Sequence, residues 1–316
     1  MKKETIKGYK GFDKGLKCRD FQYKENTTFT TKEKPELCES GFHFCENPLD
    51  VLDYYNLCDS EFTEVEAIGK TKSDNQKTVT NKIKIGLKID LKSFIKASID
   101  FIWEKCKVSE GENVQAASGN SSQLAASGDS SQLAASGYYS QLAASGDYSQ
   151  LAASGNSSQL AASGDYSKLA ASGYSIKLAA SGYSSKLAAS GDSSQLAASG
   201  NSSQLAASGY YSQLAASGYY SKLAASGDSS KLAASGNSSK LAASGDSSKL
   251  ELSGKDSVGA NIGIKGIIKA FKGCWITLAE YDNNNKILCV KSTKVTGKTI
   301  KSGIWYKLID GKFTEV

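Results

Sequence analysis

The sequence predicts a mainly β protein with a central two-sided β-solenoid of nonapeptide repeats, a small α+β N-terminal domain and a β-rich C-terminal tail. Three observations lead to this prediction. Glycine recurs at a strict spacing of nine residues from Gly119 to Gly254, which is typical of a stacked repeat. The unit between successive glycines has a single leucine and suits a short strand better than a helix. The segments before and after the repeat lack this period and contain strand-like runs.

Changes in composition divide the chain into four expected parts. We expect an α+β domain over residues 1–90, a capping helix over 91–107, the solenoid over 108–262 and a β-meander over 263–316. The net charge of +6 arises in the tail, because residues 255–316 hold 11 lysines and 5 acidic residues. The repeat itself is close to neutral.

Each nonapeptide reads Gly, then Asp/Asn/Tyr, Ser/Tyr, Ser, Gln/Lys, Leu, Ala, Ala and Ser, and these places are called positions 1 to 9 below. A helix is a poor fit, because glycine costs about 1 kcal/mol per helical position relative to alanine. In a strand, the serine at position 4, the leucine at position 6 and the alanine at position 8 share one face. Two units, 18 residues, therefore close into one coil. Roughly eight coils at about 4.8 Å each give a rod of about 36–40 Å.

The inward leucines are expected to form two columns. One column holds Leu124, Leu142 and Leu160, and the other holds Leu133, Leu151 and Leu169. The inward serine needs a hydrogen-bond partner, which we expect to be a serine one coil away or the backbone. The turns are assigned to glycine and asparagine, because both accept positive φ at little cost.

The stretch SGYYSQLAASGDYSQLAA keeps a glycine, a corner tyrosine, an inward serine and an inward leucine. This pattern resembles the β-solenoid of bacterial ice-nucleation proteins, and the resemblance implies a solenoid fold. Gln141 and Ala143 stand at outward positions where those proteins carry a Thr-x-Thr pair, so we expect no ice binding. The scarcity of acidic residues in the repeat argues against a calcium-binding roll, and its balanced charge argues against a DNA mimic.

Tyrosines replace small residues at the turns of several units. If alternate units share a corner, Tyr148, Tyr166 and Tyr183 fall on successive coils along one edge, and Tyr219 and Tyr220 follow further along. An exposed tyrosine offers rigid contact area at low entropic cost. These five residues are the candidate interaction site. We expect an unidentified protein partner, and a homodimer formed through this edge is one hypothesis.

Both flanks of the repeat are suited to end it. Residues 91–107 place apolar side chains at helical spacing, and we expect this helix to cover an otherwise open strand edge. The apolar residues are Leu91, Phe94, Ile95, Ile99, Ile102, Trp103 and Cys106. The lysines of the tail, with Trp275 and Trp305, make nucleic-acid binding an alternative function. We interpret these lysines as a solvated face and expect no nucleic-acid partner.

In the N-terminal domain, CESGFHFCENPLDVLDYY predicts a strand, a turn and a helix, with Asn47 as N-cap and Pro48 at the first helical position. ETIKGYKGF, FTEVEAIG and NKIKIGLKID predict further strands. The signature GFHxCENPLDVLxYY, followed by a Gly/Ser/Ala repeat and a tail LAEYDxNxxILCVK, resembles an uncharacterised family of phage and low-GC Gram-positive proteins. The resemblance implies a phage or prophage gene and no established activity. Our main prediction is a non-catalytic scaffold that binds or spaces a protein partner.

The order of a YKGF strand, a GFHFC strand and a helix that ends in Tyr-Tyr resembles ADP-ribosyltransferases. The resemblance implies an alternative, enzymatic function in which His43 or Tyr55 contacts the substrate and Glu64 or Glu66 is the acid. The chain departs from that family, because its first strand has no Arg or His and Glu64-Val-Glu66 comes earlier than the family's acid. We therefore expect no catalytic residue.

The cysteines are scattered and fall outside the repeat: Cys18, Cys38, Cys45, Cys58, Cys106, Cys274 and Cys289. We expect free, buried thiols. A zinc site would use Cys38, His43 and Cys45 with Cys18 or Cys58, but the paired C-x2-C spacing of common zinc sites is missing. We expect no metal and no cofactor.

Hydropathy bears on where the protein resides. The chain has no run of about 18 apolar residues, and no apolar segment follows the N-terminal lysines. We therefore expect no membrane contact and a location in the cytoplasm of a bacterial host cell.

Overall fold

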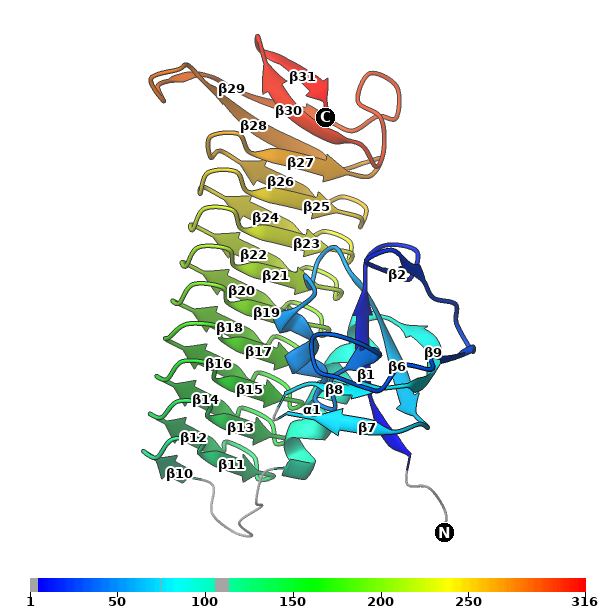
Figure 1. Ribbon diagram of the computed structural model, residues 1–316. Helices are drawn as coiled ribbons and strands as arrows, with labels where there is room; N and C mark the ends of the chain where they lie inside the picture. The colour runs from blue at the N-terminus through cyan, green and yellow to red at the C-terminus, as the bar shows by residue number, and fades with distance from the viewer. Residues whose placement is uncertain (1–4, 75, 106–113) are drawn as a thin grey trace. The chain divides into compact units, whose positions relative to one another are not determined.

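The computed structural model describes residues 5–74, 76–105 and 114–316 (Figure 1). The chain divides into two compact units, Met1–Phe101 and Ile102–Val316, and each is described by itself. Cys106 and the expected start of the solenoid at residue 108 lie outside the described residues, as does the side chain of Trp103. The predicted fold class is confirmed, since a central β-solenoid follows a small N-terminal domain.

The N-terminal unit is built on a four-stranded antiparallel sheet of order β1-β6-β9-β4, with a second sheet of order β5-β8-β7 and the short hairpin β2-β3. The strands are β1 (Ile6–Phe12), β2 (Lys17–Cys18), β3 (Phe21–Gln22), β4 (Thr28–Thr30), β5 (Phe42–Phe44), β6 (Glu61–Ala67), β7 (Thr71–Ser73), β8 (Thr78–Thr80) and β9 (Lys82–Ile89). Alternate residues of these strands face one core, in which Phe12, Val65, Ile83 and Ile85 are buried. The four strands expected from sequence in this domain correspond to β1, β5, β6 and β9.

The predicted helix after Asn47 is a 3-10 helix, η1 (Pro48–Asp53), and not an α-helix. Asn47 is its N-cap, because the Oδ1 atom of Asn47 accepts a hydrogen bond from the backbone N–H of Leu49 at 3.1 Å. The element ends after six residues, which is longer than the usual 3-10 run of about three to four residues.

The predicted helix over 91–107 is α1 (Leu91–Lys105). Asp90 caps it, with its Oδ1 atom accepting from the backbone N–H of Ser93 at 2.8 Å. Within the N-terminal unit, the ring of Phe94 packs against the ring of Phe62 on β6, with centroids 4.6 Å apart. Part of the apolar face of α1 thus belongs to the N-terminal unit, and the role of the helix as a cap stays a prediction.

The second unit consists of two facing sheets whose strands alternate along the chain (Figure 1). The first sheet contains β10 (Val114–Ala117), β12 (Gln132–Ala135), β14 (Gln150–Ala153), β16 (Lys168–Ala171), β18 (Lys186–Ala189), β20 (Gln204–Ala207), β22 (Lys222–Ala225), β24 (Lys240–Ala243), β26 (Val258–Asn261), β28 (Trp275–Tyr281) and β29 (Ile287–Lys294). The second sheet contains β11 (Gln123–Ala126), β13 (Gln141–Ala144), β15 (Gln159–Ala162), β17 (Lys177–Ala180), β19 (Gln195–Ala198), β21 (Gln213–Ala216), β23 (Lys231–Ala234), β25 (Lys249–Leu252), β27 (Ile267–Ala270), β30 (Trp305–Ile309) and β31 (Lys312–Glu315).

Each repeat strand pairs in parallel with the strand 18 residues further on, without a register shift. Leu124 therefore pairs with Leu142 and Leu142 with Leu160, and the second leucine column forms in the same way. The inward serines other than Ser248 bond to backbone, one of the two partners expected. The hydroxyl of Ser140, for example, donates to the carbonyl oxygen of Gly137, three residues earlier, at 2.8 Å.

The repeat glycines serve a purpose that differs from the one expected from sequence. Among those from Gly119 to Gly254, only Gly173 has a positive φ. A Cβ atom on Gly200 would lie 2.0 Å from the carbonyl oxygen of Gly182 in the preceding coil, so the glycine permits close stacking of backbones. The left-handed conformation falls instead on position 3, as at Ser202 with φ 59°. The backbone N–H of Ser202 donates to the carbonyl of Tyr219 in the next coil at 2.7 Å, which holds this conformation.

The ladder continues beyond the boundary that we expected at residue 262. β27 pairs in parallel with β25, and β28 pairs in parallel with β26. The tail strands then divide between the two sheets, because β29 adds antiparallel to β28, while β30 and β31 extend from β27. Each sheet thus ends in an antiparallel hairpin. Among the described residues, no helix has the length and hydropathy needed to cross a membrane.

Candidate functional site

Tyrosine side chains line one edge of the solenoid. We call this edge the first edge, and it consists of the turns that precede the strands of the first sheet. Tyr148, Tyr166 and Tyr183 lie there on three successive coils, as predicted from their spacing. The rings of Tyr148 and Tyr166 stack with centroids 5.1 Å apart, and the ring of Tyr183 meets that of Tyr166 edge-on at 5.9 Å. Their exposed fractions are 57, 44 and 45%. The three rings form one continuous exposed ladder.

The other two predicted interaction residues lie on the same edge but at a distance along it. Tyr219 and Tyr220 occupy the turn before β22, and the coil that carries Asn201 lies between this turn and Tyr183. The structure therefore brings three of the five predicted residues together and leaves Tyr219 and Tyr220 as a separate exposed pair.

Acidic and amide side chains at position 2 order both edges, a feature that the sequence analysis missed. The Oδ1 atom of Asp147 accepts from the backbone N–H of Asp165 at 2.8 Å, and Asp165 accepts in the same way from Tyr183 at 2.6 Å. This side chain satisfies a turn donor of the next coil. A signal was present in the sequence, because each position-2 tyrosine follows an Asn or Asp one coil earlier.

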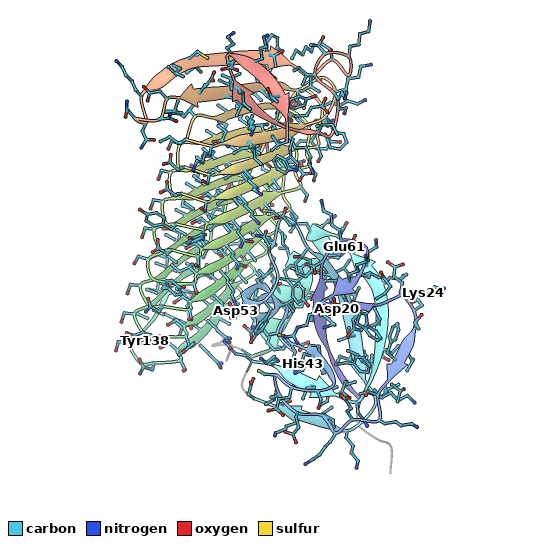
Figure 2. The ribbon with its side chains drawn as sticks, turned by 45° about the horizontal axis from the view of Figure 1, so that its top comes forward. Asp20, Lys24, His43, Asp53, Glu61 and Tyr138 are labelled. Carbon is cyan, nitrogen blue, oxygen red and sulfur yellow. The ribbon has the colours of Figure 1, made fainter. Side chains whose placement is uncertain are left out.

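The opposite edge carries tyrosines on alternate coils. Tyr138, Tyr174 and Tyr210 occupy position 2 there and are all exposed, and Figure 2 labels Tyr138. Asn156 and Asp192 fill the intervening coils and accept from the backbone N–H groups of Tyr174 and Tyr210, both at 2.8 Å. Tyrosine rings on this edge are spaced by two coils and form no continuous ladder of the kind seen on the first edge.

The N-terminal unit contains a half-open cavity of about 1370 Å³. Its lining includes parts of β1, the β2-β3 hairpin, β5 and the end of η1, and three lining residues, Asp20, His43 and Asp53, are labelled in Figure 2. Lys10 on β1 lines this cavity although the residue is only 4% exposed. Sequence reasoning did not single out Lys10.

The ammonium group of Lys10 has few polar partners. It donates to the carbonyl oxygen of His43 at 2.9 Å and lies 3.8 Å from the Sγ atom of Cys18. It also lies 5.4 Å from the centroids of both the Phe12 and the Tyr23 ring, within range of cation–π attraction. Burial holds the pKa of Lys10 below its ordinary value, because the charged form loses hydration.

Burial also shifts the pKa of Tyr55 and of His43 in the direction that favours the uncharged form. The hydroxyl of Tyr55 lies 3.0 Å from the Sγ atom of Cys18, and burial raises the pKa of Tyr55, with this contact as a further cause. Burial, followed by the nearby charge of Lys10, lowers the pKa of His43. The Nε2 atom of His43 accepts a hydrogen bond from the backbone N–H of Cys38 at 3.0 Å, as a neutral imidazole can.

The residues of the enzymatic alternative are divided by the fold. His43 and Tyr55 line the same cavity, but Glu64 and Glu66 on β6 are not among its lining residues. Glu66 instead forms an ion pair with Lys84 on β9 at 3.4 Å. The lining of the cavity that holds His43 and Tyr55 therefore includes neither candidate acid.

Cys18, Cys38, Cys274 and Cys289 are free thiols, but the described cysteines are not all buried as we expected. Among the described cysteines, Cys38 is exposed and has a left-handed φ of 64°, whereas Cys45 and Cys274 are buried. Within the described parts of the chain, no group of three or more His, Cys, Asp or Glu side chains could hold a metal ion.

A family model matches the N-terminal part of the chain. Residues 6–97 match a domain of unknown function (DUF7666). This match covers most of the N-terminal unit, including part of α1, and excludes the repeat. No curated protein and no solved structure matches the chain.

Proposed function

We propose that this protein is a non-catalytic scaffold, of phage or prophage origin, whose solenoid presents the first edge to a protein partner. The ladder of Tyr148, Tyr166 and Tyr183 carries the proposal. Three exposed rings in mutual contact form a preordered aromatic strip, so little side-chain entropy remains to be lost on binding. Tyrosine is also among the residues that dominate the energetics of protein interfaces.

The frame behind the ladder supports the same role. The backbone N–H of Tyr148 donates to the carbonyl of Asp165 in the next coil at 2.8 Å, and that of Tyr166 donates to the carbonyl of Tyr183 at 2.7 Å. The side chains of Asp147 and Asp165 also accept hydrogen bonds from backbone N–H groups of the next coil, so they hold the same turns. Because each turn of the ladder is bonded to a neighbouring coil, the tyrosine rings keep fixed positions along the solenoid. A surface that docks a partner, or holds it at a set distance, needs such fixed positions.

A second copy of the chain is the partner that tests this proposal most simply. We expect the wild-type protein to self-associate in sedimentation velocity and the triple variant Tyr148→Ser, Tyr166→Ser, Tyr183→Ser to sediment as a monomer. The removal of three exposed side chains leaves the inward core untouched, so circular dichroism should not change. A matched control replaces Tyr138, Tyr174 and Tyr210 on the opposite edge and should keep the wild-type mass. A triple variant with wild-type mass would reject the first edge as the contact.

The enzymatic alternative rests on one observation, the presence of His43 and Tyr55 in one cavity. It predicts transfer or hydrolysis when the protein is incubated with labelled NAD, and loss of this activity on Glu66→Gln. We expect neither, because Glu66 pairs with Lys84 away from the cavity.

Nucleic-acid binding through the tail is tested by retention on immobilised DNA or RNA. Binding through the 11 lysines of residues 255–316 would weaken steeply with salt concentration. We expect no such retention, because lysines on exposed strand faces are commonly solvated.

A further inference from the structure

Lys10 is a buried cation without an acidic partner. Among the residues that the structure describes, none of the carboxylates that line the cavity forms an ion pair with it, and its polar contacts are the carbonyl of His43 and the Sγ atom of Cys18. Burial of an unpaired ammonium group is costly, and proteins normally pair such a charge. The group therefore calls for a compensating negative charge.

The neighbouring groups leave the ammonium incompletely satisfied. It has three N–H donors, of which the bond to His43 at 2.9 Å uses one. The Cys18 sulfur at 3.8 Å is a distant and weak acceptor, and it also contacts the Tyr55 hydroxyl at 3.0 Å. The rings of Phe12 and Tyr23 attract the charge but accept no conventional hydrogen bond.

An aromatic wall lies in the same cavity. Phe21, Tyr23, Phe29 and Phe42 all line it, and the ring of Phe21 makes edge-to-face contacts with the other three at centroid distances of 4.7, 5.5 and 6.0 Å. Phe21 is nevertheless 45% exposed on the two-residue strand β3. The Phe21 ring is thus fixed by its three aromatic neighbours but exposed on one side. A second planar ring can contact it there in a stacked or edge-on arrangement.

The rim of the cavity restricts the charge of a ligand. The acidic lining residues are exposed and lie toward solvent: Asp13, Asp20, Glu33, Glu39, Asp53 and Asp59. They outnumber Arg19 and Lys77, the other cations of the lining, while Lys10 is buried. Their charges oppose a dense polyanion, but solvent and salt screen them from a single carboxylate at the buried ammonium. The volume of about 1370 Å³ leaves ample room for a small molecule.

We infer that this cavity binds a small planar aromatic carboxylate, with the carboxylate at the Lys10 ammonium group and the ring against Phe21. The carboxylate supplies the charge and the acceptors that Lys10 lacks, and the ring covers the exposed aromatic surface. The site lies wholly within the N-terminal unit, and it is independent of the proposed role of the tyrosine ladder.

Benzoate is the probe, and titration of the full chain followed by isothermal calorimetry or by ligand-observed NMR is the measurement. We expect saturable binding of benzoate and affinities at least about tenfold lower for acetate, which lacks the ring, and for benzyl alcohol, which lacks the charge. Phenyl phosphate should also bind more weakly than benzoate, because it carries more negative charge past the acidic rim. These comparisons use the wild-type protein and do not depend on the folding of a variant.

Variants then assign the two contacts. Lys10→Met should lower benzoate affinity by about tenfold to a hundredfold, because a charge-assisted hydrogen bond is lost. Phe21→Ala, at an exposed position, should also lower it. Lys24→Met is the matched control, since Lys24 is exposed on the same unit, lies outside the lining and is labelled in Figure 2. The proposal is overturned if benzoate shows no saturable binding, if acetate or benzyl alcohol binds equally well, or if folded Lys10→Met or Phe21→Ala protein keeps wild-type affinity.

Discussion

The Gly200→Ala variant is expected to lose much of the stability of the solenoid. Its added Cβ atom would lie 2.0 Å from the carbonyl oxygen of Gly182 and 2.5 Å from the carbonyl carbon, and both atoms belong to a backbone fixed by the ladder. The two coils must separate locally, which breaks interstrand hydrogen bonds on either side. We expect a loss of at least about 3 kcal/mol in the free energy of unfolding, at the upper end of the usual cost of overpacking. Denaturant unfolding followed by circular dichroism measures this loss.

Ser202→Gly is the matched control for this prediction. Ser202 lies in the same turn, but its backbone is left-handed with φ 59°, a conformation that costs a residue with a Cβ about 1 kcal/mol. Glycine removes that strain and adds unfolded-state entropy, so the two effects offset each other to within about 1 kcal/mol. Equal free energies of unfolding for Gly200→Ala and Ser202→Gly would contradict the close approach of successive coils at Gly200.

The second large effect is expected at the leucine columns, and it depends on position along the stack. Leu205 on β20 is 2% exposed in the middle of the first sheet, and Leu205→Ala should cost about 2–5 kcal/mol. Leu133 on β12 is buried equally well, but Leu133→Ala should cost less, because coils at an end can unfold without the rest. Equal losses for the two variants in denaturant unfolding would indicate one cooperative unit and contradict this expectation.

Hydrogen exchange distinguishes the same two variants locally. Leu205→Ala should increase amide exchange in the coils on both sides of β20, while Leu133→Ala should increase it only near β12. Uniform exchange across the repeat in both variants would contradict coil-by-coil stability.

The period of the repeat determined most of what could be predicted. A nine-residue unit with one inward leucine has few alternatives to a stacked coil, so the two columns and the tyrosine ladder followed from counting. The role of Gly200 could not be read in the same way, because the atom that excludes a Cβ belongs to a residue in the preceding coil. The left-handed turn residue was misassigned for a related reason, since the hydrogen bond that holds Ser202 comes from the following coil.

The cavity residues show the limit of local patterns. Lys10 resembles one more surface lysine in a lysine-rich chain, and its burial depends on His43, which is 33 residues away. One signal was available, because Lys10 alternates with Ile6 and Phe12 in an expected strand, which puts it on the same face as these apolar side chains. The opposing carbonyl and the aromatic wall required the fold itself.

Disulfide formation between engineered cysteines tests most directly the claim that 18 residues make one coil. In a chain whose native cysteines are replaced by serine, we would place one cysteine at Ala224 on β22 and the second at either Ala242 or Ala233. Ala224 and Ala242 are paired outward residues of adjacent parallel strands, about 4.8 Å apart at Cα, within reach of a disulfide. Ala233 lies on β23 in the opposite sheet. The solenoid predicts rapid oxidation of the 224/242 pair and none of the 224/233 pair, and the reverse result, or equal oxidation of both, would contradict it.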